Sequence, residues 1–317
     1  MTPLVVQTEL LDDDCRAWLA DRCRVESCPP ENAERFNELL HDAAGLVIRT
    51  YTRVDADLLV RAPRLRVVGR AGVGLDNVDL HACRERDVTV VHTPAANTVA
   101  VVEYVWGLIL DELRPRPDLV DPVAISAWKA LRTASMAVSQ ASDLTLGLLG
   151  FGRVGQRMAR IAQAFDMRVV YSDLLDIDPA RRHGAEPVDI AALFSQSDIV
   201  SLHIDGRPSN RNFVDATLLS RCRDGVLLVN ASRGFVLDAA ALASMLRRHP
   251  RSRAVIDVHE PEPFDEDYPL LGLANVRLLP HLGAATHTAH RNMSWVVRDI
   301  WRVLNDEPPE YPAAIID

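Results

Sequence analysis

The sequence is poor in cysteine and lysine, and its charges are not gathered into runs. Its 317 residues include five cysteines without a C-x-x-C pair, so we predict neither a disulfide framework nor a zinc site. Lys129 is the only lysine. The formal net charge is −9 with no long run of one sign, which argues against a surface that binds nucleic acid.

The sequence also lacks a long apolar run. The most apolar segment, Val99–Leu110, is interrupted by Glu103 and is shorter than the ~20 residues of a membrane-spanning helix. The opening residues Met1–Val6 are typical of a short strand and not of a signal peptide. We therefore expect a soluble, cytoplasmic protein with no membrane partner. Its length and its hydrophobic content of 48% are sufficient for two domains with separate cores.

Short apolar runs alternate with segments of helical spacing along the chain. In the first part, the runs typical of strands are Leu4–Val6, Gly45–Ile48, Leu65–Val68 and Val88–Val91. In the second part, they are Leu144–Leu149, Val169–Asp173, Ile199–His203, Val226–Asn230, Ala254–Asp257 and Val276–Leu279. This alternation predicts an α/β protein with two doubly wound parallel sheets, the second of six strands.

The segments between and after these runs predict the domain organisation. A predicted helix, Val99–Leu113, is followed by several prolines and a helical piece near Ala124–Ala141, which we interpret as a connector or a dimer contact. The helical tail Thr286–Leu304 is expected to cross back onto the first domain. We therefore predict one discontinuous domain at residues 1–96 and 287–317, and a second at residues 97–286, around a cleft.

A glycine-rich turn follows the first strand of the second domain. Gly150, Gly152 and Gly155 form the G-x-G-x-x-G pattern, and a helical segment and a second strand ending in Asp173 come next. The glycines allow a tight turn, a close approach of a pyrophosphate and tight packing of the helix. The helix N-terminus favours phosphate, and Asp173 can accept the two ribose hydroxyls of an adenosine. The pattern predicts a Rossmann domain that binds NAD.

Three polar side chains follow later strands of the same sheet. Arg233, Glu262 and His281 each have an ordinary alternative, as a surface salt bridge, a solvated acid and a structural histidine. Together they are what the oxidation of a 2-hydroxy acid requires. A histidine takes the hydroxyl proton, a carboxylate orients the ring, and a guanidinium holds the substrate carboxylate.

With these motifs the sequence resembles the D-isomer-specific 2-hydroxyacid dehydrogenases, most closely the phosphoglycerate dehydrogenase-like branch. The resemblance covers essentially the whole chain. The matching motifs are Gly69–Asp79, Thr93–Thr98 with Glu103, Gly150–Gly155, Asn230–Gly234 with Asp238, Asp257–Pro263 and Pro280–Ala284. It implies a flavodoxin-like substrate domain beside the NAD-binding domain, a 2-hydroxy or 2-keto acid as substrate, and a homodimer.

The resemblance also implies roles for single residues. Arg233 is the substrate anchor, His281 the acid/base and Glu262 its partner, while the backbone of Val73 and Gly74 binds the substrate carboxylate. The implied cofactor contacts are Gly150, Gly152, Arg153, Val154, Gly155, Asp173, His203, Ala231, Ser232, Asp257 and Gly283. No metal site is predicted, because His287 and His290 fit a solvated helix face.

Some positions depart from the family pattern and leave the substrate open. His203–Pro208 replaces the usual His-x-Pro-Leu-Thr, and His259 stands where an aromatic residue is usual. Arg49 corresponds to an arginine that meets the substrate phosphate in phosphoglycerate dehydrogenases. The substrate is therefore either a phosphorylated acid such as 3-phosphoglycerate or a small one, as in a glyoxylate/hydroxypyruvate reductase. A nucleotide-sensing protein related to co-repressors is the alternative from another class.

Overall fold

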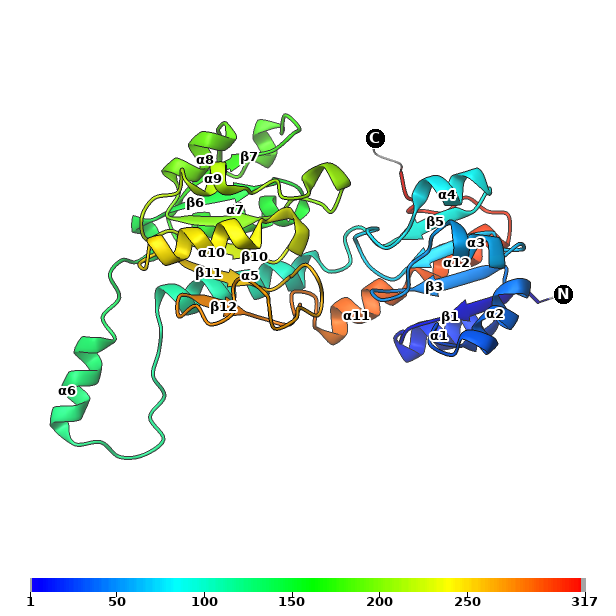
Figure 1. The fold of residues 1–317 in the computed structure, drawn as a ribbon, viewed down its shortest axis with the longest axis horizontal. Helices are drawn as coiled ribbons and strands as arrows, with labels where there is room; N and C mark the ends of the chain where they lie inside the picture. Colours follow the sequence, from blue (N-terminus) through cyan, green and yellow to red (C-terminus); the bar gives the residue numbers. More distant parts are fainter. Residues whose placement is uncertain (1, 315–317) are drawn as a thin grey trace. The chain divides into compact units, whose positions relative to one another are not determined.

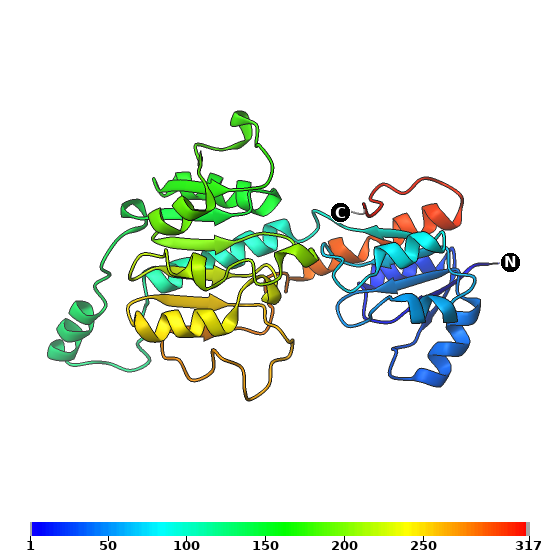
Figure 2. The ribbon, with the colours of Figure 1, turned by 45° about the horizontal axis from the view of Figure 1, so that its top comes forward.

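The computed structural model describes residues 2–314, and the chain divides into two compact units (Figures 1 and 2). Unit 1 comprises Met1–Asn97 and Ala284–Asp317, and unit 2 comprises Thr98–Gly283. Each unit is built on one parallel sheet with its own hydrophobic core. Within residues 2–314, no helix is long and apolar enough to cross a membrane.

In the described part of unit 1, five parallel strands form the sheet in the order β2-β1-β3-β4-β5. The strands are β1 (Leu4–Gln7), β2 (Arg24–Ser27), β3 (Gly45–Ile48), β4 (Val67–Arg70) and β5 (Thr89–His92). This is the flavodoxin-like order. The strand β2 was missing from the sequence prediction because it lies at the edge, is largely exposed and has no run of apolar residues.

Helices cover both faces of this sheet (Figure 1). They are α1 (Asp13–Ala20), α2 (Ala33–Asp42), α3 (Ala56–Arg61), α4 (Leu80–Glu85), α11 (His287–Ser294) and α12 (Val297–Leu304). Aspartates at positions 12, 55 and 79 start three of them by accepting a backbone N–H of the first turn. The C-terminal helix α12 packs so closely on β4 that a Cβ at Gly69 would collide with Ile300.

In the described part of unit 2, seven parallel strands lie in the order β12-β11-β10-β9-β6-β7-β8. They are β6 (Thr145–Leu149), β7 (Arg168–Ser172), β8 (Glu186–Pro187), β9 (Ile199–Leu202), β10 (Leu227–Asn230), β11 (Arg253–Ile256) and β12 (Val276–Leu278). The sequence prediction of six strands was therefore one short. The missing strand, β8, has only two residues, both of them exposed, and it pairs with β7 at the edge of the sheet.

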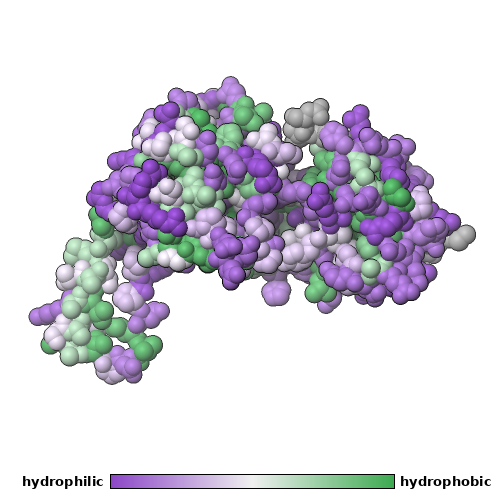
Figure 3. All heavy atoms as spheres, in the orientation of Figure 1, coloured by the Kyte–Doolittle hydropathy of each residue, from purple (hydrophilic) through white to green (hydrophobic). Residues whose placement is uncertain are grey.

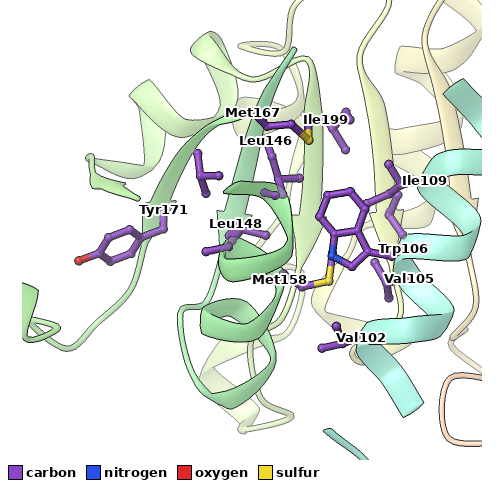
Figure 4. Close-up of a cluster of buried hydrophobic side chains, with 14 of the residues drawn as sticks. Val102, Val105, Trp106, Ile109, Leu146, Leu148, Met158, Met167, Tyr171 and Ile199 are labelled. Carbon is purple, nitrogen blue, oxygen red and sulfur yellow. The ribbon is translucent and has the colours of Figure 1, made fainter. Parts of the chain in front are cut away.

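Helices cover both faces of this sheet as well. The helices are α5 (Thr98–Leu113), α6 (Ile125–Ala134), α7 (Arg153–Ala164), α8 (Ile190–Gln196), α9 (Ala216–Leu219) and α10 (Ala239–Arg248). Of these, α5 and α7 pack on one face and α8, α9 and α10 on the other. Single 3₁₀ turns are η1 (Ala141–Asp143), η2 (Pro179–Arg181), η3 (Pro208–Asn210) and η4 (Gly234–Val236). Figure 4 shows Trp106 and Ile109 of α5 against Met158 of α7 and Leu146 of β6. Fully burying such an aliphatic side chain contributes about 1.5–3 kcal/mol.

The segment between α5 and β6 stands off from the rest of unit 2 (Figures 1 and 2). It carries α6, a helix with no buried residue among its ten. Apolar side chains nevertheless recur along this segment, which we call the arm, and Figure 3 shows green and pale atoms over it. The exposed ones are Leu119, Val120, Val123, Ile125, Trp128, Met136 and Val138. A contiguous exposed apolar surface of this kind is typical of an interaction site.

Candidate active site

The glycine turn of unit 2 has the geometry of a dinucleotide-binding loop. Gly150 has a φ of 90°, a left-handed conformation that favours glycine, and a Cβ there would strike the backbone of His203. A Cβ on Gly155 would collide with the carbonyl of Gly150. At Gly152, by contrast, a Cβ would meet nothing within 4 Å, so the backbone there is open to a close-lying ligand. The helix α7 starts at Arg153 and points its positive dipole end at this space.

Asp173, just beyond β7, folds back onto this turn. One carboxylate oxygen accepts the backbone N–H of Phe151 at 2.5 Å, and the other accepts that of Leu175 at 2.9 Å. A carboxylate has about four acceptor positions, so both oxygens retain capacity for ribose hydroxyls. The Asp173 carboxylate also acts electrostatically on Arg207, which follows β9 and whose guanidinium is bound in two-pronged fashion by Asp205.

His281 and Glu262 form a hydrogen-bonded pair at the carboxyl edge of the same sheet. The Nδ1 of His281 donates to Oε2 of Glu262 at 2.8 Å. The backbone N–H of His281 donates to Asp257, and its φ of 56° is a left-handed conformation that is uncommon for a side-chain-bearing residue. Burial acts to raise the pKa of Glu262, but the hydrogen bonds from His281 and His259 outweigh it and lower that pKa. Glu262 is therefore an anion that holds the ring and presents Nε2 outward.

Asp257 fixes the turn that follows His281. Its Oδ1 accepts the backbone N–H of Leu282 and the hydroxyl of Tyr104, both at 2.8 Å, and its Oδ2 accepts the N–H of Gly283 at 2.9 Å. Burial, reinforced by the Asp257 carboxylate, raises the pKa of Tyr104, which keeps the hydroxyl protonated as a donor. Tyr104 comes from α5 and was missed by the sequence analysis, because no local motif marks a contact between residues so far apart.

The loop after β10 is organised by Asn230, a second residue that the sequence analysis assigned no role. Its Oδ1 accepts the backbone N–H and the hydroxyl of Ser232, and its Nδ2 donates to the carbonyl of Arg233. Arg233 also donates from its guanidinium to the carbonyl of Ser232 at 2.7 Å. The loop packs so tightly on the following segment that a Cβ at Gly234 would collide with the His259 carbonyl. The predicted residues Ala231, Ser232 and Arg233 thus lie on one constrained turn.

His203 lies at the end of β9, beneath the glycine turn. Its backbone N–H donates to Leu149, and its Nε2 is 2.9 Å from the hydroxyl of the buried Ser201. Burial lowers the pKa of His203 to about 4, so the ring is neutral near neutral pH. A neutral, hydrogen-bonded ring in this position supports the turn.

In unit 1, the predicted residue Arg49 lies on a turn that is built around a carboxylate. Glu9 accepts four successive backbone N–H groups, from residues 49 to 52, at 2.8–3.2 Å. Burial acts to raise the pKa of Glu9, but these four bonds lower it on balance. On the other side of the turn, Asn77 donates to the carbonyls of Arg49 and Thr52. The sequence analysis did not predict this role of Glu9, since a single acidic residue after a strand does not indicate a turn or a site.

Asn77 belongs to the same loop after β4 as the predicted residues Val73 and Gly74. His92 fixes that loop, because its Nδ1 lies 2.9 Å from the carbonyl of Val73. The structure thus joins the Arg49 turn and the Val73–Gly74 loop within unit 1, and it groups the other predicted residues within unit 2. In residues 2–314, no group of three or more His, Cys, Asp or Glu side chains could hold a metal ion.

Comparisons with known proteins agree with this geometry. The model of the D-isomer specific 2-hydroxyacid dehydrogenase NAD-binding domain matches residues 106–283. An (S)-sulfolactate dehydrogenase from Chromohalobacter salexigens is 37% identical over 93% of this chain and 96% of its own length. A D-3-phosphoglycerate dehydrogenase from Methanocaldococcus jannaschii is 33% identical over 96% of this chain and 58% of its own. The chain spans about half the length, 48–58%, of the phosphoglycerate dehydrogenases it matches.

The fold is likewise that of a solved structure, the TT0316 protein from Thermus thermophilus, with a TM-score of 0.82 and 31% identity. That match covers 98% of this chain and 100% of the other. The chain therefore belongs to the D-isomer specific 2-hydroxyacid dehydrogenase family and is an NAD-dependent oxidoreductase. Its two parallel α/β sheets confirm the predicted fold class.

Proposed function

We propose that the protein interconverts a D-2-hydroxy acid and its 2-keto acid, with His281 as the acid/base, Glu262 as its partner and Arg233 as the substrate anchor. The observation that carries this proposal is the 2.8 Å hydrogen bond between His281 and Glu262 at the carboxyl edge of the sheet that bears the glycine turn. Ligands of doubly wound sheets bind at that edge. In this proposal unit 1 is the substrate domain.

Each residue has a defined task in the reaction. NAD supplies the hydride acceptor, and Gly152, the start of α7 and Asp173 would hold its pyrophosphate and ribose. During oxidation, Nε2 of His281 takes the hydroxyl proton while Glu262 stabilises the positive charge that forms on the ring. During reduction, the protonated ring returns that proton to the carbonyl oxygen. Arg233 pairs with the substrate carboxylate and fixes C2 relative to His281.

The direct test of this function is a panel of 2-keto acids with NADH, comprising glyoxylate, hydroxypyruvate, phosphohydroxypyruvate and sulfopyruvate. We expect turnover of at least one of them above the background without enzyme. The alternative, a nucleotide-sensing protein, predicts tight NADH binding with no turnover of any member. The retained histidine, carboxylate and arginine favour the enzyme, because a sensor has no need of an acid/base pair.

We further propose that the substrate carries a second anionic group that Arg49 binds. The sulfolactate and phosphoglycerate dehydrogenases that resemble this chain are named for acids with a sulfonate or a phosphate. Glu9 and Asn77 hold the turn that carries Arg49, and the Arg49 guanidinium lies 3.4 Å from the Leu10 carbonyl. A rigid turn that presents a guanidinium suits a dianionic substrate. The competing possibility is a small substrate, as in a glyoxylate/hydroxypyruvate reductase.

Replacement of Arg49 by alanine separates these two substrates. A charge-assisted hydrogen bond contributes about 1.5–3 kcal/mol, so KM for the phosphorylated or sulfonated keto acid should rise roughly ten- to a hundredfold. KM for glyoxylate should barely change. Arg61→Ala, at an exposed position on α3, is the matched control. An enzyme that turns over glyoxylate well, ignores the dianionic acids and is indifferent to Arg49→Ala would refute the second-anion site.

We expect the protein to prefer NAD to NADP by at least tenfold in kcat/KM. The carboxylate of Asp173 would repel a 2′-phosphate, and Arg207 is already engaged by Asp205. Repulsion between a carboxylate and a phosphate that lie close together in a shielded site costs more than ~1 kcal/mol. Asp173→Ala should raise kcat/KM with NADP and narrow the preference. Equal kcat/KM for the two cofactors in the wild type would refute this role for Asp173.

We propose that the protein works in the reducing cytoplasm, and its five free cysteines support this proposal.

We also propose that the arm mediates a homodimer, and the exposed apolar side chains of the arm support this proposal. Light scattering should give twice the 35.1 kDa chain mass. The double variant Trp128→Glu with Met136→Glu should give the monomer, and Val60→Glu, at an exposed position of α3, should not. A wild-type monomer at micromolar concentration would contradict the dimer.

A further inference from the structure

A buried histidine lies behind the His281–Glu262 pair and takes no part in the chemistry described above. His259 follows β11 and is only 5% exposed. Its ring packs edge-on against Phe264 and Tyr268, with centroids 4.6 and 5.4 Å away. An aromatic residue could make these packing contacts equally well, so packing alone does not account for a histidine.

The ring nitrogens make two hydrogen bonds that an aromatic hydrocarbon cannot make. Nε2 lies 2.8 Å from the carbonyl of Leu279, and Nδ1 lies 3.2 Å from the hydroxyl of Tyr268. A carbonyl can only accept, so Nε2 carries a hydrogen, and in the tautomer with that hydrogen Nδ1 is the acceptor for the Tyr268 hydroxyl. Burial raises the pKa of Tyr268 to about 12, which keeps that hydroxyl protonated. The ring is thereby held in one tautomer.

The same residue also makes backbone contacts with the other catalytic segments. Its N–H donates to Oε1 of Glu262 at 2.6 Å, while Oε2 of that carboxylate accepts from His281. Its carbonyl lies against Gly234, where no side chain would fit beside Arg233. Leu279, the partner of its ring, precedes His281 by two residues in the chain. His259 therefore touches the segments that carry all three proposed catalytic residues.

We propose that His259 is a positioning residue that sets the relative placement of Glu262 and His281. The backbone N–H fixes one oxygen of Glu262, and the ring ties the strand end before His281 to the same segment. Loss of the bond to Leu279 would leave the 2.8 Å geometry of the pair to weaker restraints. Catalysis is sensitive to such shifts, since a misplacement of about 1 Å can lower a rate about a hundredfold.

This inference rests on the proposed roles of Glu262 and His281, and four variants of the full chain test it. His259→Phe keeps the ring shape and removes both ring hydrogen bonds. In His259→Gln the amide nitrogen can reach Leu279, whereas in His259→Asn it is too short to do so. Tyr268→Phe keeps the bond to Leu279 and removes only the hydroxyl. The measurements are kcat and KM for the best keto acid of the panel, the Kd of NADH and the Tm.

We expect His259→Phe to lower kcat about ten- to a hundredfold, with KM and the NADH Kd within about threefold of the wild type. His259→Gln should recover at least half of that loss on a logarithmic scale. Tyr268→Phe should stay within about threefold. A histidine that served only for stability would lower Tm without this selective effect on kcat. If His259→Phe does not fold, the same conclusion requires that His259→Asn loses more kcat than His259→Gln.

Two outcomes would overturn the inference. The first is a kcat for His259→Phe, or for His259→Asn if the former is not folded, within twofold of the wild type. The second is a loss of kcat in His259→Gln that equals the loss in His259→Phe, or in His259→Asn if His259→Phe is not folded. His281→Ala, measured in parallel, separates this failure from a failure of the proposed function. If His281→Ala retains full turnover, the catalytic assignment itself is wrong and the role of His259 falls with it.

Discussion

Replacement of His281 by alanine should lower kcat by about 10²–10⁴-fold, which is the usual contribution of a positioned acid/base. The expectation follows from the position of the ring, because Glu262 fixes Nδ1 at 2.8 Å and leaves Nε2 to exchange the substrate proton. The Kd of NADH should stay close to that of the wild type, since the glycine turn and Asp173 are untouched. Steady-state kinetics and fluorescence titration with NADH measure the two quantities.

Two further variants make this result specific. His249→Ala removes a surface histidine of unit 2 that lies beside Asp224 and should leave kcat unchanged. Glu262→Gln removes the carboxylate that accepts from Nδ1 and stabilises positive charge on the ring, so kcat should fall while the Kd of NADH stays close to that of the wild type. A kcat within threefold of the wild type for His281→Ala, or an unchanged kcat for Glu262→Gln, would contradict the proposed pair.

Replacement of Arg233 by alanine should lower kcat/KM by about 10²–10⁴-fold. A two-pronged pairing with the substrate carboxylate comprises two charge-assisted hydrogen bonds, each of about 1.5–3 kcal/mol. The loop around Arg233 is held by Asn230 and by the close contact of Gly234 with His259, so the guanidinium is preorganised. Arg233→Lys should recover only part of the loss, because an ammonium cannot reproduce a planar fork. Both effects are read from kcat/KM for the best keto acid.

The control for this prediction is Arg251→Ala, which removes an exposed arginine that pairs with Asp224. Its kcat/KM should match the wild type. Full activity of Arg233→Lys would show that a point charge suffices and would argue against the two-pronged contact. Full activity of Arg233→Ala would exclude Arg233 as the anchor.

The sequence predicted those parts of the fold that depend on local patterns. Buried strands such as β6 and β9 are predominantly apolar runs, and the positions of Gly150 and Gly155 require glycine because of backbone angle and close contacts. The edge strands β2 and β8 were missed because exposed or two-residue strands have no such pattern. Pairing within a sheet, and not local preference, makes them strands.

The residues that support the candidate site could not be predicted from the sequence, since they act across long separations. Tyr104 and Asp257 are 153 positions apart, and Glu9 and Arg49 are 40 apart. No local motif brings these groups together, and only the folded sheets do. The position of His259 was visible as a departure from the family pattern, but its hydrogen bonds to Leu279 and Tyr268 depend on packing and were not.

The most direct test of the central claim is to follow the hydride itself. The purified protein would be mixed with NADH that carries deuterium at the transferred position and with the best 2-keto acid of the panel other than glyoxylate, whose product glycolate has no D or L form, and the product would be analysed by mass spectrometry and chiral chromatography. The account predicts a D-configured 2-hydroxy acid with one deuterium at C2. An L-configured or unlabelled product, or no product at all while NADH binds, would contradict it.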